Sequence, residues 1–196
     1  IMTKDDGINS IKDLKGKKVA GPKGTILHQL LLAAIKQNQM SIDDVEYINI
    51  GIPEAVAAMN SGNVDVALVA GPTVPQAMNA GARILTTGEG LLDATIVIAV
   101  RGEFLRKHPD LVKRYMDVHY KSLEYMKENP EEVYKMAAEE TGISEEDVVT
   151  MYGWYDFNPE ITEKDIEELE KTQGFLIENE MLDQPINISD IIENKL

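Results

Sequence analysis

The residue types best suited to binding chemistry lie at one turn. Lys23, Gly24 and Thr25 follow an apolar stretch at 18–21 and open a stretch with helical spacing at 25–37. The first N–H groups of a helix have no intrahelical partner, and the helix dipole makes that end positive. Gly24 lets a ligand approach the backbone, and Thr25 adds a hydroxyl. The turn therefore predicts a site for an anion or a polar head group. The structural alternative is a junction that only caps a helix.

Two further turns follow the predicted strands 45–50 and 64–70. The second of these strands is almost continuously apolar, as expected of a central parallel strand. Ligands of open α/β sheets bind at the carboxyl ends of the strands, so we expect the three turns to line one edge. The candidate residues that these two turns add are Gly51, Ile52, Gly71, Pro72 and Thr73.

The sequence contains no recognisable catalytic or metal-binding constellation. It has no cysteine, and no glycine-rich nucleotide-binding motif or nucleophile-elbow motif is found. His28, His108 and His119 are far apart and match no metal-ligand spacing. We therefore expect each histidine to pack or to lie at the surface, and we predict no catalytic residue, no metal and no cofactor.

The net charge of −15 is concentrated in the second half of the chain. Residues 1–100 carry 10 acidic and 8 basic side chains, whereas residues 101–196 carry 24 and 11. This balance argues against nucleic acid and against an anionic membrane surface as partners, since both reward clustered Lys and Arg. No apolar run is long enough to span a membrane, and no signal peptide is recognised.

Hydrophobic spacing divides the chain into two parts with different predicted secondary structure. Residues 18–100 alternate strands and helices, with a last apolar strand at 94–100, and predict a doubly wound α/β lobe. Residues 101–196 read as a run of helices without strands, interrupted by an aromatic loop at 152–159. The apolar faces of these helices need a partner surface.

Several segments resemble the substrate-binding proteins of ABC importers of the nitrate/sulfonate/taurine type, which have a periplasmic-binding-protein-like fold. The first is IKDLKGKKVA at 11–20, followed by Pro-Lys-Gly-Thr. The resemblance continues through the helix–Gly–strand segment at 54–67, and covers almost the whole chain. Its remaining matches are at 104–105, 108–112, 129–132 and 166–187.

The resemblance implies a fold and a domain plan. It implies a crossover at 1–17 from an absent first-lobe segment, an α/β second lobe at 18–100 that includes a return strand, and the helical C-terminal part of the first lobe at 101–196. It also implies that the chain, which begins with Ile1, is a fragment. Helices without their covering segment would expose apolar surface, so we expect the fragment to dimerise or swap.

The resemblance also implies a function. The protein would be a periplasmic or extracellular, membrane-associated receptor that delivers a small polar or anionic solute to the membrane subunits of an importer. The turns would hold the ligand; Trp154 would wall the site from the other lobe, or its loop would pack between helices. Two alternatives remain: an enzyme related to the pyrimidine-forming enzyme of thiamine biosynthesis, and a ligand-sensing module of a signalling protein.

Overall fold

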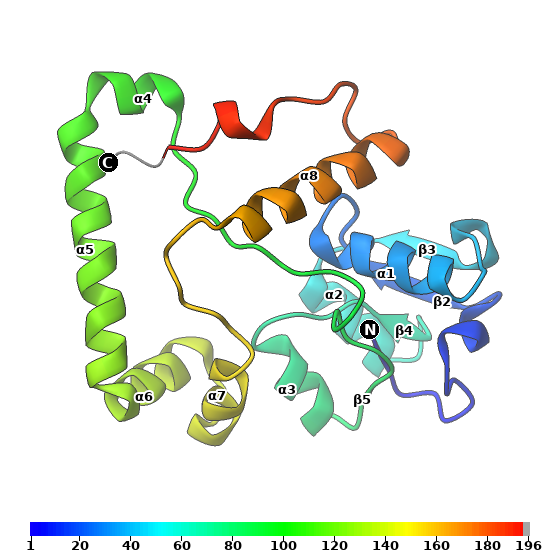
Figure 1. Cartoon of the computed structure of the whole chain (residues 1–196). Helices are drawn as coiled ribbons and strands as arrows, with labels where there is room; N and C mark the ends of the chain where they lie inside the picture. The colour runs from blue at the N-terminus through cyan, green and yellow to red at the C-terminus, as the bar shows by residue number, and fades with distance from the viewer. Residues whose placement is uncertain (194–196) are drawn as a thin grey trace. The chain divides into compact units, whose positions relative to one another are not determined.

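The computed structural model describes residues 1–193 (Figure 1). The chain forms two compact units, Ile1–Ala94 and Thr95–Leu196, and each is described by itself. The first unit holds all the strands of the described residues, and the second is helical. The boundary between the units lies after Ala94, whereas the sequence predicted a break after residue 100.

The first unit is built on a five-stranded mixed sheet in the order β3-β2-β4-β1-β5. β2 pairs in parallel with β3 on one side and with β4 on the other, whereas β1 is antiparallel to both of its neighbours. The three parallel strands therefore end at the same edge. The strand bounds are β1 Met2–Thr3, β2 Lys18–Gly21, β3 Glu46–Asn49, β4 Val66–Ala67 and β5 Arg83–Ile84.

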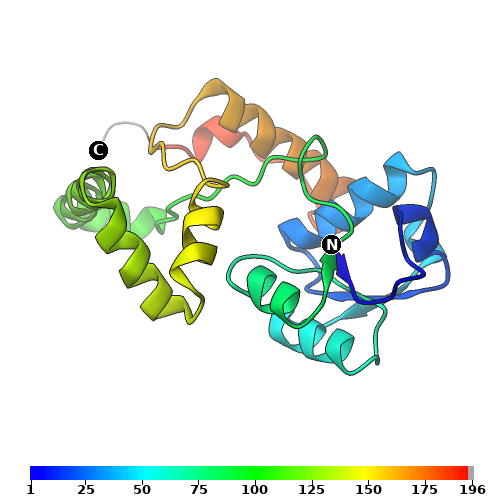
Figure 2. The ribbon, with the colours of Figure 1, turned by 90° about the horizontal axis from the view of Figure 1, so that it is seen from below.

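Both faces of this sheet are covered, as in a doubly wound fold. Alternate strand residues point to opposite faces. Val19, Val66 and Leu68 pack in one core cluster with the buried face of α1. Ala20 and Ala67 pack in a second cluster with residues of α2 and α3. Figure 2 shows α1 on one side of the strands and α2 and α3 on the other. The bounds are η1 Ile11–Leu14, α1 Ile26–Gln37, η2 Ile42–Asp44, α2 Ile52–Asn60 and α3 Thr73–Asn79.

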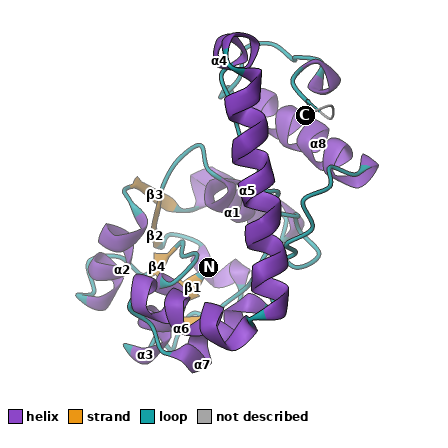
Figure 3. Ribbon diagram, turned by 90° about the vertical axis from the view of Figure 1, so that its left-hand side faces the viewer, coloured by secondary structure: helices purple, strands orange, loops and turns teal. Residues whose placement is uncertain are grey.

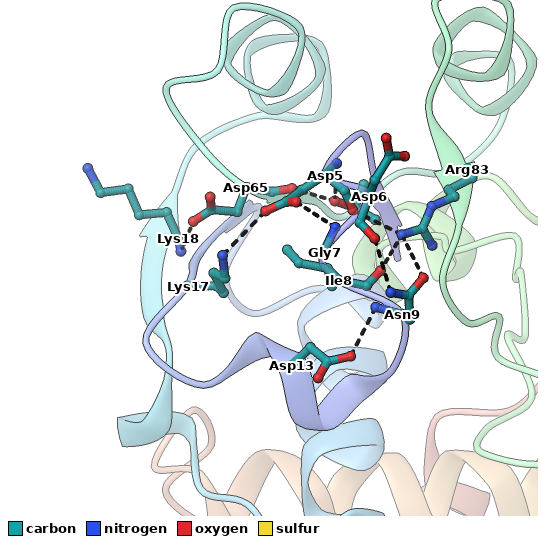
Figure 4. A network of polar contacts seen from close by, with 11 residues as sticks. Asp5, Asp6, Gly7, Ile8, Asn9, Asp13, Lys17, Lys18, Asp65 and Arg83 are labelled. Atoms are coloured by element: carbon teal, nitrogen blue, oxygen red, sulfur yellow. Dashed lines mark hydrogen bonds and ion pairs between the residues drawn. The ribbon is translucent and has the colours of Figure 1, made fainter.

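The first residues of the chain are an integral part of the sheet. β1 lies between β4 and β5, and its residues Met2 and Thr3 are buried. Arg83 on β5 then holds the loop that follows β1: its Nη2 donates to the carbonyl oxygens of Asp5 and Ile8 (Figure 4). The Asp5 carboxylate in turn accepts from the N–H of Gly7 and from Lys17 Nζ. This network ties the start of the chain to the sheet.

The second unit contains only helical elements among its described residues, as Figure 3 shows. α5 leaves much of its apolar surface open: Leu111, Tyr115 and Val118 are each about half exposed or more. The expectation of uncovered apolar helix faces is thus met, while self-association stays a prediction. The bounds are α4 Gly102–Lys107, α5 Pro109–Glu128, α6 Pro130–Thr141, α7 Glu145–Tyr152, α8 Glu163–Glu178 and η3 Ile188–Asp190.

The prediction of a return strand at 94–100 is wrong. These residues form no strand, and Ile96 is 81% exposed. The apolar, β-branched sequence has the composition of a buried strand. A strand also needs a neighbouring backbone to complete its hydrogen bonds, and none of the five described strands pairs with this stretch.

Replacing Arg83 tests the network at the start of the chain. Arg83→Ala removes the donor that serves two backbone carbonyls, and we expect the free energy of unfolding of the first unit to fall by about 1–3 kcal/mol. Urea unfolding measures the change. Arg101→Ala is the control, because Arg101 is largely exposed and makes only a loose ion pair with Glu103. Equal stability of the two variants would contradict the assignment.

Replacing Gly21 tests the close contact between the end of β2 and Leu68, the residue after β4. A Cβ atom on Gly21 would lie 2.6 Å from the side chain of Leu68, which is fully buried. We therefore expect Gly21→Ala to destabilise by about 1–3 kcal/mol through overpacking. Gly174→Ala is the matched control, since a Cβ there meets no atom within 4 Å and a helical Ala is favoured over Gly. Thermal unfolding that leaves both variants at or above the wild-type midpoint would refute the contact.

Candidate functional site

The three predicted turns follow the three parallel strands at one edge of the sheet. Gly21 is the register partner of Asn49, so the turns after β2 and β3 leave from adjacent positions. β4 flanks β2 on its other side, and the N–H of Leu68 donates to the carbonyl of Ala20. The structure thus places the turns of the first unit on neighbouring strands, at the edge where open α/β sheets bind ligands.

The turn at 22–25 is held by bonds from within the protein. Lys23 N–H donates to Asn49 Oδ1 (2.8 Å), and Gly24 N–H donates to His28 Nδ1 (3.4 Å). The Thr25 hydroxyl donates to the carbonyl of Pro22 (2.9 Å). Gly24 has φ +76°, a left-handed conformation that favours glycine. Lys23, Gly24 and Thr25 are all exposed, so the turn combines a fixed shape with access from solvent.

The helix behind this turn starts in a way that suits an anion. Thr25 is the N-cap of α1 with an extended backbone, and its side chain caps no N–H group. The first turn of α1 carries no acidic residue, and Lys23 lies just before it. No carboxylate of the first turn of α1 therefore offsets the positive end of this helix dipole.

The turn after β3 has the opposite electrostatic character. Gly51 is the N-cap of α2, and Ile52 and Pro53 open the helix. Glu54 stands in the first turn, and its carboxylate lies so close to Gly51 that a Cβ there would be 2.4 Å from Oε2. A carboxylate at this end satisfies the helix dipole from within and opposes an anion.

The turn after β4 is shaped by local bonds. Gly71 has φ +61°, and Thr73, the first residue of α3, donates its hydroxyl to the carbonyl of Ala70 (2.6 Å). Gly71, Pro72 and Thr73 are half-buried. α3 has no acidic residue in its first turn, so this turn shares with the turn at 22–25 the absence of a competing carboxylate.

Trp154 belongs to the second unit. It follows α7, its side chain is 57% exposed, and its N–H donates to the carbonyl of Met151. The ring contacts of this loop are made by its neighbours, with Tyr152 stacked on Phe157 at 4.7 Å between ring centroids. The role of Trp154 as a ligand contact stays a prediction.

Sequence reasoning missed three residues that hold the turn at 22–25: His28, Tyr47 and Asn49. The His28 ring is 4% exposed and lies 4.9 Å from the Tyr47 ring, whose hydroxyl donates to the carbonyl of Gly21. Burial, with a smaller contribution from the charge of Lys23, lowers the pKa of His28, and burial raises the pKa of Tyr47 to about 12. The expectation that His28 packs is confirmed, but its bond to Gly24, four residues earlier, was not anticipated.

A family model described as "NMT1/THI5 like" matches residues 1–133, more than half of the chain. The chain belongs to the NMT1/THI5-like family. The matched part includes all three turns of the first unit, so the candidate residues of that unit lie within the matched region.

Two curated relatives of this family member carry names that describe binding. A "Putative aliphatic sulfonates-binding protein" of Bacillus subtilis is 28% identical over 99% of the chain and 59% of the relative. The "Taurine-binding periplasmic protein" of Escherichia coli is 34% identical over 55% of the chain and 35% of the relative. The chain therefore spans about three fifths or less of the length of these proteins.

Solved structures share the fold. The periplasmic aliphatic sulphonate binding protein SsuA of Escherichia coli superposes with a TM-score of 0.83 over 100% of this chain and 65% of that one, at 20% identity. The desulfurization enzyme DSZB has a TM-score of 0.70 over 96% of the chain and 71% of the enzyme, at 19% identity. The expected periplasmic-binding-protein-like fold is confirmed, and the same fold carries both a binding protein and an enzyme.

The other features that could indicate a binding site or a membrane segment do not involve the three turns. A groove of about 590 Å³ lies between α5 and α6 in the second unit, lined mainly by apolar residues such as Val118, Tyr125 and Met136; none of the predicted site residues lines it. Residues 1–193 hold no group of His, Asp and Glu side chains arranged for a metal ion. Among the same residues, no helix has the length and apolar character needed to cross a membrane.

The buried His28 predicts a specific pH dependence of stability. Its pKa lies below the ordinary 6.5 in the folded chain, so the unfolded chain binds the proton first as the pH falls. The contribution of neutral His28 is therefore complete above pH 6.5 and is lost below it, by at most about 1.4 kcal/mol per pH unit. We expect the unfolding free energy of wild type minus that of His28→Phe to decrease as the pH is lowered from 7.5 to 5. Urea unfolding at several pH values measures it, and a difference that grows on acidification would contradict the prediction.

Proposed function

We propose that this chain is part of an extracytoplasmic solute receptor that binds a small sulfonate-class anion for an ABC importer. One observation carries the proposal: the family's sequence region places an acid-free helix start, next to Lys23, at the carboxyl edge of a parallel sheet. A sulfonate is a compact anion with three acceptor oxygens, which is the chemistry that exposed N–H groups at a helix start receive.

The names of the relatives support the same proposal. They are called binding proteins for aliphatic sulfonates and for taurine, which carries a sulfonate group. They support a receptor over the pyrimidine-forming alternative. The residues proposed to contact the ligand in the first unit are Lys23, Gly24, Thr25, Gly51, Ile52, Gly71, Pro72 and Thr73.

The contacts divide these residues into two groups. The turns at 22–25 and 71–73 have no acidic residue in the helix that follows, so we assign the anionic head to them. The turn at Gly51 and Ile52 stands beside Glu54, so we assign to it a neutral or cationic part of the solute, such as an alkyl chain or an amine. A taurine-like molecule, with an anion at one end and an ammonium at the other, has this polarity.

The proposed partners and compartment follow from the receptor function. Delivery of a solute requires docking on the membrane subunits of the importer, and a receptor of this kind acts outside the cytoplasmic membrane. The description of one relative as periplasmic supports this placement. We propose binding without turnover, although the fold is shared with a desulfurization enzyme.

A thermal-shift screen tests the function. The probes are ethanesulfonate, taurine, nitrate, bicarbonate and a pyrimidine, each in large excess over the protein. A ligand that binds only the folded chain stabilises it by ~2.7 kcal/mol at a hundredfold excess over its Kd. We expect a sulfonate to raise the unfolding midpoint. NMR should show that the sulfonate is chemically unchanged after incubation with the protein. No shift with either sulfonate would refute the proposed class, and release of sulfite would replace a receptor by an enzyme.

A matched pair of variants localises the binding. Thr25→Ala removes the hydroxyl bond to Pro22 that holds the turn, and it should weaken the response to the sulfonate by about 0.5–1.5 kcal/mol, the range for one hydrogen bond. Thr150→Ala is the control, because its hydroxyl is also exposed and donates to a nearby backbone carbonyl, but it lies on α7 in the second unit. Equal losses in both variants would place the sulfonate away from the turn at 22–25.

A further inference from the structure

The turn proposed to receive the anion is fixed by two side chains that lie behind it. Asn49 Oδ1 accepts the N–H of Lys23, and His28 Nδ1 accepts the N–H of Gly24. We propose that Asn49 and His28 are positioning residues, which commit these two N–H groups to the protein and so direct the ligand to the start of α1. This inference rests on the proposed function for the ligand, but the positioning itself does not depend on it.

Asn49 is well placed for such a role. It is the last residue of β3 and the register partner of Gly21, so its backbone is fixed by the sheet next to the end of β2. Its side-chain amide reaches across to the turn that follows the neighbouring strand β2, and its bond to Lys23 is the shortest of the bonds that hold this turn (2.8 Å). Because an amide is neutral, Asn49 orders the turn without bringing a negative charge to an anion site.

His28 supports the second N–H group from the helix itself. To accept from Gly24, Nδ1 must be unprotonated, which requires the neutral ring with its proton on Nε2. The ring is buried against Tyr47, whose hydroxyl donates to the carbonyl of Gly21. The groups that face His28 are therefore Lys23 from the turn and Tyr47 from β3, and neither supplies a negative charge that would favour the imidazolium.

These two bonds decide which donors remain. With Lys23 and Gly24 committed, the N–H groups of Thr25 and Ile26 have no acceptor among the described residues. Both groups lie at the positive end of α1, whose first turn carries no acidic side chain. The sulfonate oxygens would thus be received at the helix start, with Lys23 contributing its ammonium group rather than its amide.

Amide hydrogen exchange followed by NMR tests the positioning without any ligand. In Asn49→Leu the Lys23 amide should exchange about tenfold faster, whereas Asn49→Asp keeps an acceptor oxygen and should keep the protection. In His28→Phe the Gly24 amide should lose protection, and His28→Asn, which places an oxygen near the position of Nδ1, should restore it. Unchanged protection of Lys23 in Asn49→Leu, or of Gly24 in His28→Phe, would overturn the proposal.

Binding of ethanesulfonate to the same variants tests the consequence for the ligand. Asn49→Asp should hold the turn yet weaken ethanesulfonate binding at least about tenfold, because it adds a charge of the ligand's own sign. Binding unchanged in Asn49→Asp would overturn the placement of the anion at this turn. If wild type binds no ethanesulfonate, the proposed function fails by itself, and the exchange measurements still decide the positioning.

Discussion

The pairing of β2 with both β3 and β4 is the constraint on which the first unit depends. β2 is short, and its residues Val19 and Ala20 pack in the two separate core clusters on opposite faces of the sheet. Its last residue, Gly21, lies against the side chain of Leu68, where no larger residue fits without a shift. Because all three turns start from this group of strands, the closeness of β2 to its neighbours fixes how near the turns are to one another.

The sequence predicted the parts of the fold that local pattern controls. Helix α1 and the parallel strands on either side of it were visible in their apolar spacing, and the helical second unit was visible in its charges. The stretch at 94–100 shows the limit of this reasoning: its residue types favour a strand, but pairing depends on a partner that residue types do not reveal. The place of β1 was equally hidden, because a strand of two residues, Met2 and Thr3, is too short a pattern to show that it enters the middle of a sheet.

The position of the turn that carries Lys23, Gly24 and Thr25 could be predicted from the sequence, but the hydrogen bonds that hold this turn could not. The order of strand, glycine-containing turn and helix was enough to single out Lys23, Gly24 and Thr25. Which of their N–H groups are free depends on Asn49, which is 26 residues away in sequence and is adjacent only through the register of β2 and β3. His28 was closer, and its spacing of four residues from Gly24 on a helix start is a signal that could have been read. Without the strand register, however, neither acceptor could be assigned to its donor.

Electrostatics explains why these details of bonding matter in so acidic a chain. With a net charge of −15, the protein as a whole repels an anion, and the excess of acid lies in residues 101–196. Salt screens exposed charges beyond a Debye length of about 8 Å, so binding is decided by the few groups next to the ligand. The start of α1 offers Lys23 and N–H donors and has no carboxylate in its first turn, whereas the first turn of α2 carries Glu54. A single charge at either turn, rather than the total charge of the chain, therefore separates a helix start that can receive an anion from one that cannot.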